Sequence, residues 1–304
     1  MTWPELPYAA WHETRDTLHG HTQLLGKLAA ALAPPEPQLQ HAALRLTARG
    51  WETAPLPARD GSGALVVALD LRACEAVVEH SAAGDTRIPL TPDRSVGAVA
   101  RDVLAAVRAV GGPLELELTP QETTWTTPLD EDEAHATLDW QHAAAYLSAA
   151  TQAARVLAAL RAPYRGRSTP VNAWWGSFDL SVSLFSGEPA EPPASDFITR
   201  NAMDAEEVAV GWWPGMEQYP KAAFYAYAHP APAGFADASL APAAAHWDPA
   251  LGEFILDWDD IRGERDPFAS ALAFARSAVL HACDVCGWDA PLTASAAGET
   301  PPVV

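Results

Sequence analysis

The sequence has few cysteines and few basic residues, and each shortage argues against a class of protein. Only three cysteines occur in 304 residues, and Cys74 is far in sequence from Cys283 and Cys286, so we expect no disulfide framework. The 19 Lys and Arg residues stand against 39 Asp and Glu residues, which gives a formal charge of −20. Such a charge repels phosphate backbones and anionic lipids. We therefore expect neither nucleic-acid nor membrane partners.

Long apolar runs and familiar catalytic motifs are also missing. No run of about 18 apolar residues occurs, and the N-terminal MTWPELPYAAW lacks the basic and apolar regions of a signal peptide, so we expect a cytoplasmic protein. The absence of GxSxG, HExxH, Walker A and dinucleotide-binding patterns disfavours the serine hydrolase, zincin, kinase and Rossmann classes. Cys283 and Cys286 form a CxxC pair without a second pair, so we predict no metal site. The sequence identifies no cofactor.

What the sequence does contain is an internal similarity. The stretch LHGHTQLLGKLAAALAPP from Leu18 resembles LSAATQAARVLAALRAPY from Leu147, with the dipeptide Thr-Gln at equivalent places. Each stretch is followed by strand-like segments, a Gly-marked turn and an Ala-rich helix. Such a repeat predicts an α+β fold made of two tandem helix–antiparallel sheet–helix units, related as a pseudo-duplication.

The expected organisation follows this repeat. We predict a first repeat over residues 1–122, an acidic linker over 123–136 that contains DEDE, a second repeat over 137–290 and a disordered tail over 291–304. Hydrophobic periodicity predicts helices at 7–32, 96–110, 140–160 and 268–286. It predicts strands at 42–49, 64–71, 74–80, 114–120, 171–185, 208–212, 222–228, 243–247 and 253–256.

The WWGSFDL segment is the first candidate for a ligand site. On an extended strand, Trp175, Ser177 and Asp179 share one face, and Trp174 lies on the other. An aromatic plane beside two polar groups is typical of a ligand wall. The alternative is that the two Trp residues fill a core while Ser177 and Asp179 cap a sheet edge.

The FYAYAH segment is the second candidate. Its alternation places Tyr225, Tyr227 and His229 on one face, where His229 would serve as a general base near neutral pH. The alternative is an outer sheet face, where Tyr is common without any function. Two scarce cations, Arg165 and Arg200, would clamp a carboxylate or phosphate, or else form structural ion pairs.

A polar stripe on the first helix is the third candidate. His19, Gln23 and Lys27 recur at intervals of four, opposite a face that carries Leu18 and Leu25. The stripe is either solvated or, at a seam between repeats, a set of hydrogen-bonding groups.

The segments STPVNAWWGSFDLSVSLFSG, ITRNAMDAEEVAVGWWPG, AAFYAYAHPAPAGF and WHETRDTLHGHTQLLGK together resemble the domain-of-unknown-function 5996 family over nearly the whole chain. The resemblance implies no established activity. The chain departs from the family pattern with Asn172 in place of His and with MDAEE from Met203 in place of a Ser-His-Glu run. It therefore does not support a metal site built from those histidines.

Two classes of function fit these observations. In the first, a pocket between the repeats binds a small polar or anionic ligand, with Asp179 or His229 as acid or base and the arginines neutralising an anion. Binding alone and catalysis both remain open within this class. In the second, the protein is a scaffold or interaction module whose aromatic surface contacts a partner or, in a homodimer, a second copy.

Overall fold

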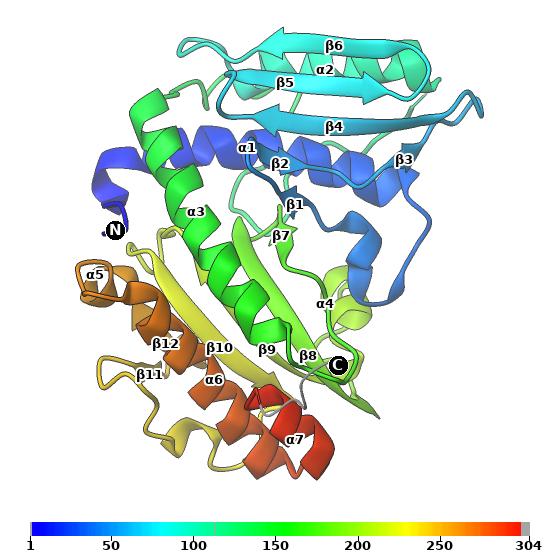
Figure 1. The fold of residues 1–304 in the computed structure, drawn as a ribbon. Helices are drawn as coiled ribbons and strands as arrows, with labels where there is room; N and C mark the ends of the chain where they lie inside the picture. The colour runs from blue at the N-terminus through cyan, green and yellow to red at the C-terminus, as the bar shows by residue number, and fades with distance from the viewer. Residues whose placement is uncertain (1, 113, 299–304) are drawn as a thin grey trace, which may run out of the picture. The chain divides into compact units, whose positions relative to one another are not determined.

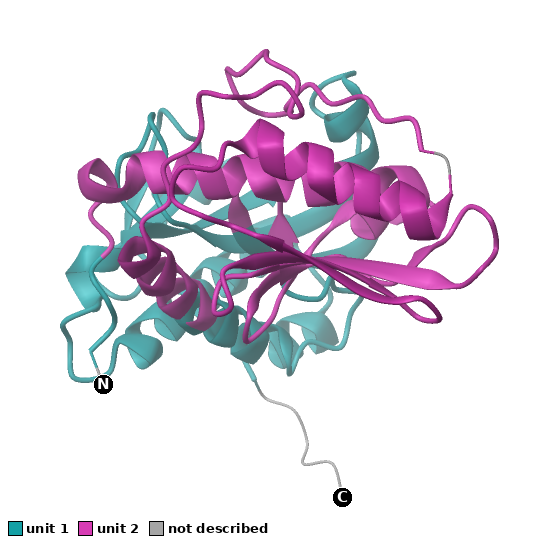
Figure 2. Cartoon of the chain, turned by 90° about the horizontal axis from the view of Figure 1, so that it is seen from above, with its two compact units in different colours: residues 1–5, 152–171, 180–304 teal, residues 6–151, 172–179 magenta. Residues whose placement is uncertain are grey.

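The computed structural model describes residues 2–112 and 114–298, which form two compact units (Figure 2). Unit 1 comprises residues 1–5, 152–171 and 180–304, and unit 2 comprises residues 6–151 and 172–179. Helix α3 (Trp140–Arg161) carries the chain from unit 2 into unit 1. The expected domain bounds and the pseudo-duplication stay predictions.

Unit 2 combines two long helices with an antiparallel sheet (Figure 1). Its strands lie in the order β1 (Arg45–Leu46), β2 (Gly50–Glu52), β4 (Ala64–Asp70), β5 (Glu75–His80) and β6 (Gly84–Pro89), and β3 (Leu56–Pro57) also pairs with β4. Helix α1 (Tyr8–Leu32) contacts β4 and ends just before Pro34 and Pro35, which cannot continue a helix. Helix α2 (Val96–Gly111) contacts β5 and is capped at its N-terminus by Ser95, whose hydroxyl accepts the Ala98 N–H at 3.1 Å.

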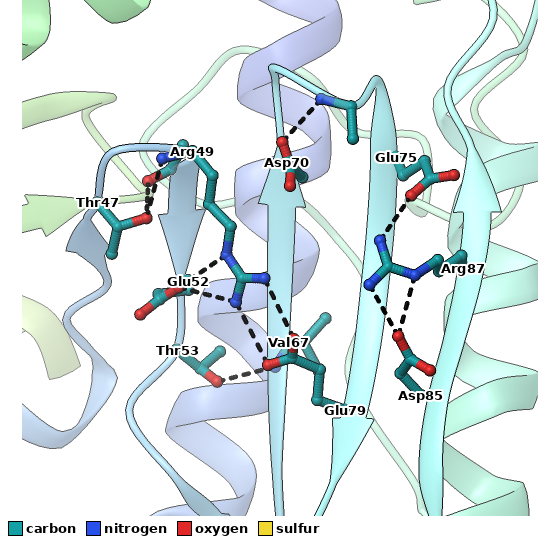
Figure 3. A network of polar contacts seen from close by, with 12 residues as sticks. Thr47, Arg49, Glu52, Thr53, Val67, Asp70, Glu75, Glu79, Asp85 and Arg87 are labelled. Atoms are coloured by element: carbon teal, nitrogen blue, oxygen red, sulfur yellow. Dashed lines mark hydrogen bonds and ion pairs between the residues drawn. The ribbon is translucent and has the colours of Figure 1, made fainter.

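The solvent-facing side of this sheet carries a network of ion pairs (Figure 3). Arg49 donates to Glu52 and Glu79 at 3.2 Å, and Arg87 donates to Glu75 at 3.0 Å. All of these side chains are partly or largely exposed, so solvent screens each pair and its contribution to stability is small. The ion pairs of Arg49 and Arg87 therefore link neighbouring strands of this sheet.

Unit 1 contains a second antiparallel sheet. Its strands lie in the order β11 (His246–Asp248), β12 (Glu253–Asp257), β10 (Ala223–His229), β9 (Ala205–Trp213) and β8 (Asp179–Pro189). Helix α6 (Pro267–Cys286) covers one face and contacts β9, β10 and β12 (Figure 1). The shorter helices of this unit are α4 (Phe197–Ala202), α5 (Trp258–Ile261), α7 (Ala290–Ala296) and the single turn η2 (Phe235–Asp237).

Helix α6 is long and apolar enough to cross a membrane, judged by length and composition alone. It also has the contacts of a core helix, because Ala271, Phe274 and Ala278 are fully buried. One such helix is weak evidence for a membrane span, since a core helix has the same composition.

The predicted α+β class, with antiparallel sheets, is confirmed. The predicted strand at 114–120 is wrong, although Leu114 is buried and Glu115 exposed as the alternation requires. A segment with alternating burial is a β-strand only if a neighbouring strand pairs with it. The tail is helical at Ala290–Ala296, whereas residues 299–304 lie outside the described part of the chain.

The predicted continuous strand at 171–185 is also wrong. Strand β7 (Asn172–Trp174) ends in a turn over residues 175–178, where Phe178 has a φ of +58°. A left-handed Phe is rare, and the turn sequence contains no signal as clear as Asn-Gly. The alternation that would place Trp175, Ser177 and Asp179 on one strand face therefore does not hold.

Candidate functional site

The sheet of unit 1 has one apolar face covered by α6, and an opposite face that combines polar groups with the buried cluster Trp213, Ala223, Tyr225 and Ile255. Val210, Trp212 and Phe224 have no exposed surface, and Phe254 of the neighbouring strand lies against His281 of α6 at 6.4 Å between ring centroids. Ala226 pairs with both Val210 and Phe254, so these residues share the face covered by α6. We call the opposite side the polar face and define it by Arg167, Ser183, Phe185, Glu207, Tyr225, Tyr227 and His229.

A row of four residues crosses the polar face. Glu207 of β9 is the register partner of Phe185 on β8 and of His229 on β10. The Phe185 N–H donates to the Arg167 carbonyl at 3.0 Å, which extends the row by one more segment. The Arg167 guanidinium carbon lies 3.7 Å from the Phe185 ring centroid. Because directly opposed residues point to the same side, the pairing places cation, ring, carboxyl and imidazole in sequence.

Glu207 is a buried carboxyl group with a raised pKa. Only 4% of the residue is exposed, and burial raises its pKa from the ordinary 4.5 to about 7. A hydrogen bond from Ser183 and the positive charge of Arg167 act in the opposite direction. Burial exceeds both, because a charged form without water is costly. Near neutral pH, Glu207 is therefore present in both protonation states.

His229 completes the row with a nitrogen that has no partner. The residue is 8% exposed, and its Nε2 makes no hydrogen bond within the described part of the chain. Such an atom is either an acceptor or a donor, depending on the tautomer. A buried carboxyl with a shifted pKa, opposite an unpartnered imidazole, is a candidate for acid–base chemistry.

Stacked aromatic rings border this row. Trp213 and Tyr225 stack at 4.9 Å, and Tyr225 and Tyr227 stack at 6.3 Å with an interplanar angle of 2°. Gly211 leaves room for the Tyr225 ring, since a Cβ atom at this position would lie 2.2 Å from it. The rings therefore form a fixed wall beside the titratable groups.

In unit 2, the polar stripe of α1 is buried against the turn at 175–178. His19 Nε2 lies 2.9 Å from the carbonyl oxygens of Trp175 and Gly176, and the Gln23 amide donates to the Trp175 carbonyl at 3.1 Å. Lys27 lies 5.9 Å from the Trp175 ring centroid and 3.3 Å from Glu117. The solvated alternative for these three side chains is wrong, because each is at most 6% exposed.

The turn itself is fixed by its own side chains. The Trp175 indole donates to the Ala42 carbonyl at 3.0 Å, and the exposed Ser177 donates to the buried Asp179 at 2.5 Å. Trp174 is half-buried on β7. The helix stripe and the turn therefore form one cluster, in which most polar groups bond to the backbone.

The structure separates the remaining predicted residues. Tyr225, Tyr227 and His229 lie on the polar face. Arg165 and Arg200 are exposed and lie outside the row, where Arg167 is the cation instead. Glu207, Arg167 and Ser183 were not predicted from the sequence. Two of them had a signal in the sequence. The alternation in SVSLF was the signal for Ser183, and the adjacent pair Glu206 and Glu207 was the signal for Glu207.

Metal and thiol chemistry have little support among the described residues. They contain no group of three or more His, Cys, Asp or Glu side chains arranged to hold a metal ion. Burial raises the pKa of the Cys283 thiol to about 12 and that of Cys286 to about 11. Both thiols are therefore protonated and weakly nucleophilic near neutral pH.

The fold and the two clusters define an α+β protein with buried titratable groups on a sheet face. The chain belongs to the family of unknown function DUF5996, whose family model matches residues 3–295. No curated protein and no solved structure matches it.

Proposed function

We propose that the protein binds a small polar, anionic ligand on the polar face and exchanges a proton with it through Glu207. The observation that carries the proposal is the row in which Glu207, with a pKa of about 7, lies beside the unpartnered His229 imidazole. A carboxyl group poised near the working pH is an effective acid in one form and an effective base in the other.

The neighbouring side chains give roles for the rest of the row. Arg167 is exposed and offers a guanidinium to the anionic group of the ligand. Ser183 and Tyr227 are half-buried, so the approach to Glu207 is polar and partly open to solvent. In the ionised form Glu207 takes a proton from the ligand, and in the protonated form it returns one. The earlier expectation of a pocket between the two repeats stays a prediction.

The alternative, an interaction module without chemistry, has less support. Such a module needs an exposed apolar patch. Among the described residues, Phe197 on α4 is the one large hydrophobic side chain that is exposed, at 63%. The aromatic wall beside Glu207 is mostly buried, which suits a ligand site better than a flat docking surface.

The test is a thermal-shift screen with small carboxylates at pH 6 and pH 8, using wild-type protein, Glu207→Gln and Glu206→Gln. An anionic ligand should stabilise the wild-type protein more at pH 6, because protonated Glu207 no longer repels it. Glu206→Gln is the matched control, since its side chain points to the other face, and it should behave as wild type. Glu207→Gln should lose the pH dependence. Equal pH dependence in all three proteins would contradict the proposal.

A further inference from the structure

One segment of unit 2 lies against α1 although it forms no helix or strand. Residues 114–139 contain neither element, and we call residues 117–135 the strap. The Gln23 side chain of α1 donates to the Gln121 carbonyl of the strap at 2.8 Å and accepts the Gln121 N–H at 3.0 Å. Gln23 has no exposed surface. The strap is therefore joined to α1 through a side chain, and such a segment can open without unfolding a sheet.

The far end of the strap is bound to the N-terminus of α2. The Val96 N–H donates to the His135 carbonyl, and the Gly97 N–H donates to the Asp132 carbonyl, each at 2.8 Å. The start of a helix leaves these N–H groups without partners in the helix itself. A Cβ atom on Gly97 would lie 2.9 Å from the Asp132 carbonyl oxygen. The strap therefore lies directly on the helix backbone.

An ion pair joins the two strap residues of this anchor. The His135 Nδ1 lies 2.7 Å from the Asp132 carboxylate. Asp132 is 3% exposed, whereas the His135 side chain is 21% exposed, so the imidazole is the member of the pair that solvent reaches. The His135 ring lies 4.2 Å from the Trp125 ring centroid, and Trp125 lies 5.1 Å from His19. The ion pair therefore connects the anchor on α2 with the ring beside His19.

We propose that the strap is a pH-sensitive latch, closed over the polar stripe of α1 while His135 carries a proton and released when that proton leaves. When the strap is closed, Asp132 is buried and the protonated His135 is the cation that lies against it. A neutral imidazole leaves the carboxylate without this cation, and a buried charge without a charged partner is costly. In the open strap water solvates both groups, so deprotonation favours opening. The strap, α1 and α2 all belong to unit 2.

The direction of the pH effect follows from the groups around His135. The hydrogen bond to Asp132 raises the pKa of His135 above its ordinary 6.5, burial opposes this, and the charges of Asp132 and of Asp16 on α1 add to it. The raised pKa belongs to the closed strap, so this contribution to closure is fully present below pH 6.5 and is lost as the pH rises through the raised pKa. Burial acts to raise the pKa of Asp132, but the hydrogen bonds from His135 outweigh it, and Asp132 is ionised throughout this range.

The other titratable groups beside the strap have the opposite sign or do not titrate. Lys27 donates to Glu117 of the strap at 3.3 Å. Burial lowers the pKa of Lys27, and it lowers those of His19 and His21 to about 3 and about 4. Loss of a proton from any of these three groups therefore favours the buried, closed form. Hydrogen bonds lower the pKa of Glu117 and Glu133, so both are ionised above pH 6.5. Opening at higher pH is consequently the signature of His135.

The test is hydrogen–deuterium exchange of the strap amides at pH 6.5 and pH 8.5, expressed relative to the intrinsic exchange rate at each pH. The Gln121 N–H is the probe, because its bond to Gln23 exists only while the strap is closed. In the wild-type protein its protection should fall by up to about tenfold for each unit by which closure raises the pKa of His135, and NMR of the imidazole supplies that pKa. His135→Gln should give equal protection at both pH values.

His142→Gln is the matched control. His142 and Asp139 have the same spacing of three residues, but their nearest N–O distance is 3.8 Å and the pair lies outside the strap. This variant should show the same fall in protection as the wild-type protein. Equal protection of the Gln121 N–H at both pH values in the wild-type protein, or an undiminished fall in His135→Gln, would overturn the proposal.

Gly97→Ala tests the anchor on α2 without changing a charge. The added Cβ atom would lie 2.9 Å from the Asp132 carbonyl oxygen and 3.0 Å from its backbone nitrogen, which cannot rotate away as the end of a side chain can. Ala is favoured over Gly in a helix, so the circular dichroism spectrum should be unchanged. The Gln121 N–H should lose protection already at pH 6.5, and the pKa of His135 should fall towards 6.5. Wild-type protection together with a wild-type pKa in this variant would overturn the link between the anchor and the latch.

Discussion

Glu207 and His229 are direct cross-strand partners on β9 and β10, and both are buried. Opposed residues of an antiparallel pair have Cβ atoms about 4.5–5.5 Å apart, so a single ligand group can reach both side chains. The pair therefore joins a carboxyl that titrates near neutrality to an imidazole nitrogen that has no hydrogen bond within the described residues.

Glu207→Gln should make the protein more stable at high pH. Because the folded pKa of about 7 lies above the ordinary 4.5, the native state binds more protons than the unfolded chain between these values. Stability is therefore lost as the pH rises from about 4.5 to about 7, by about 3 kcal/mol. Gln cannot ionise, so the variant should lack this loss. The measurement is the free energy of unfolding at pH 5 and pH 8. A wild-type difference as small as that of the variant would contradict the assignment.

Arg167→Gln should raise the pKa of Glu207 further. The Arg167 charge lowers this pKa in the native protein, in opposition to burial, and the substitution removes the charge. The carboxyl carbon of Glu207, followed by NMR against pH, reports the change. Since Arg167 is exposed, 1 M salt should screen the charge and reduce the difference between variant and wild type. Arg165→Gln, two residues away and equally exposed, should leave the titration as it is.

The difference between Glu206 and Glu207 shows what the sequence can and cannot predict. The predicted strand at 208–212 begins at the first apolar residue, whereas β9 begins at Ala205. Hydrophobicity ends a predicted strand where polar residues start, so a buried polar residue falls outside it. Which of two adjacent carboxyls is buried depends on the register with β10, and that register is set by contacts distant in sequence.

The helix stripe of α1 shows the opposite case. Periodicity alone groups His19, Gln23 and Lys27 on one face, and the structure places all three against the turn at 175–178. The sequence left their burial open, since it depends on packing against Trp175 and Gly176, which are more than 140 residues away along the chain. The helix face on which residues lie can thus be predicted from the sequence, whereas the segment that packs against that face cannot.

Gly211→Ala should destabilise unit 1 by disturbing the aromatic wall. A Cβ atom would lie 2.2 Å from the Tyr225 ring, which is also stacked between Trp213 and Tyr227. Ala is otherwise favoured over Gly in a strand by about 0.5–1 kcal/mol, but displacing a buried ring costs about 1–3 kcal/mol, so the clash should prevail. Chemical denaturation measures the change. Gly263→Ala is the control, because no atom lies within 4 Å of its Cβ position, and it should be neutral.

His21→Gln should reduce the acid sensitivity of unit 2. Burial lowers the pKa of His21 from 6.5 to about 4, so the unfolded chain binds more protons than the native state between these values. Stability is therefore lost as the pH falls from about 6.5 to about 4, by about 3 kcal/mol for this residue. Gln does not titrate, so the variant should lose less stability between pH 6.5 and pH 4.5, as measured by denaturant unfolding. His12→Gln, at an exposed position of the same helix, should lose as much stability as the wild-type protein over this pH range. If His21→Gln lost as much stability at low pH as the wild-type protein, the lowered pKa of His21 would be contradicted.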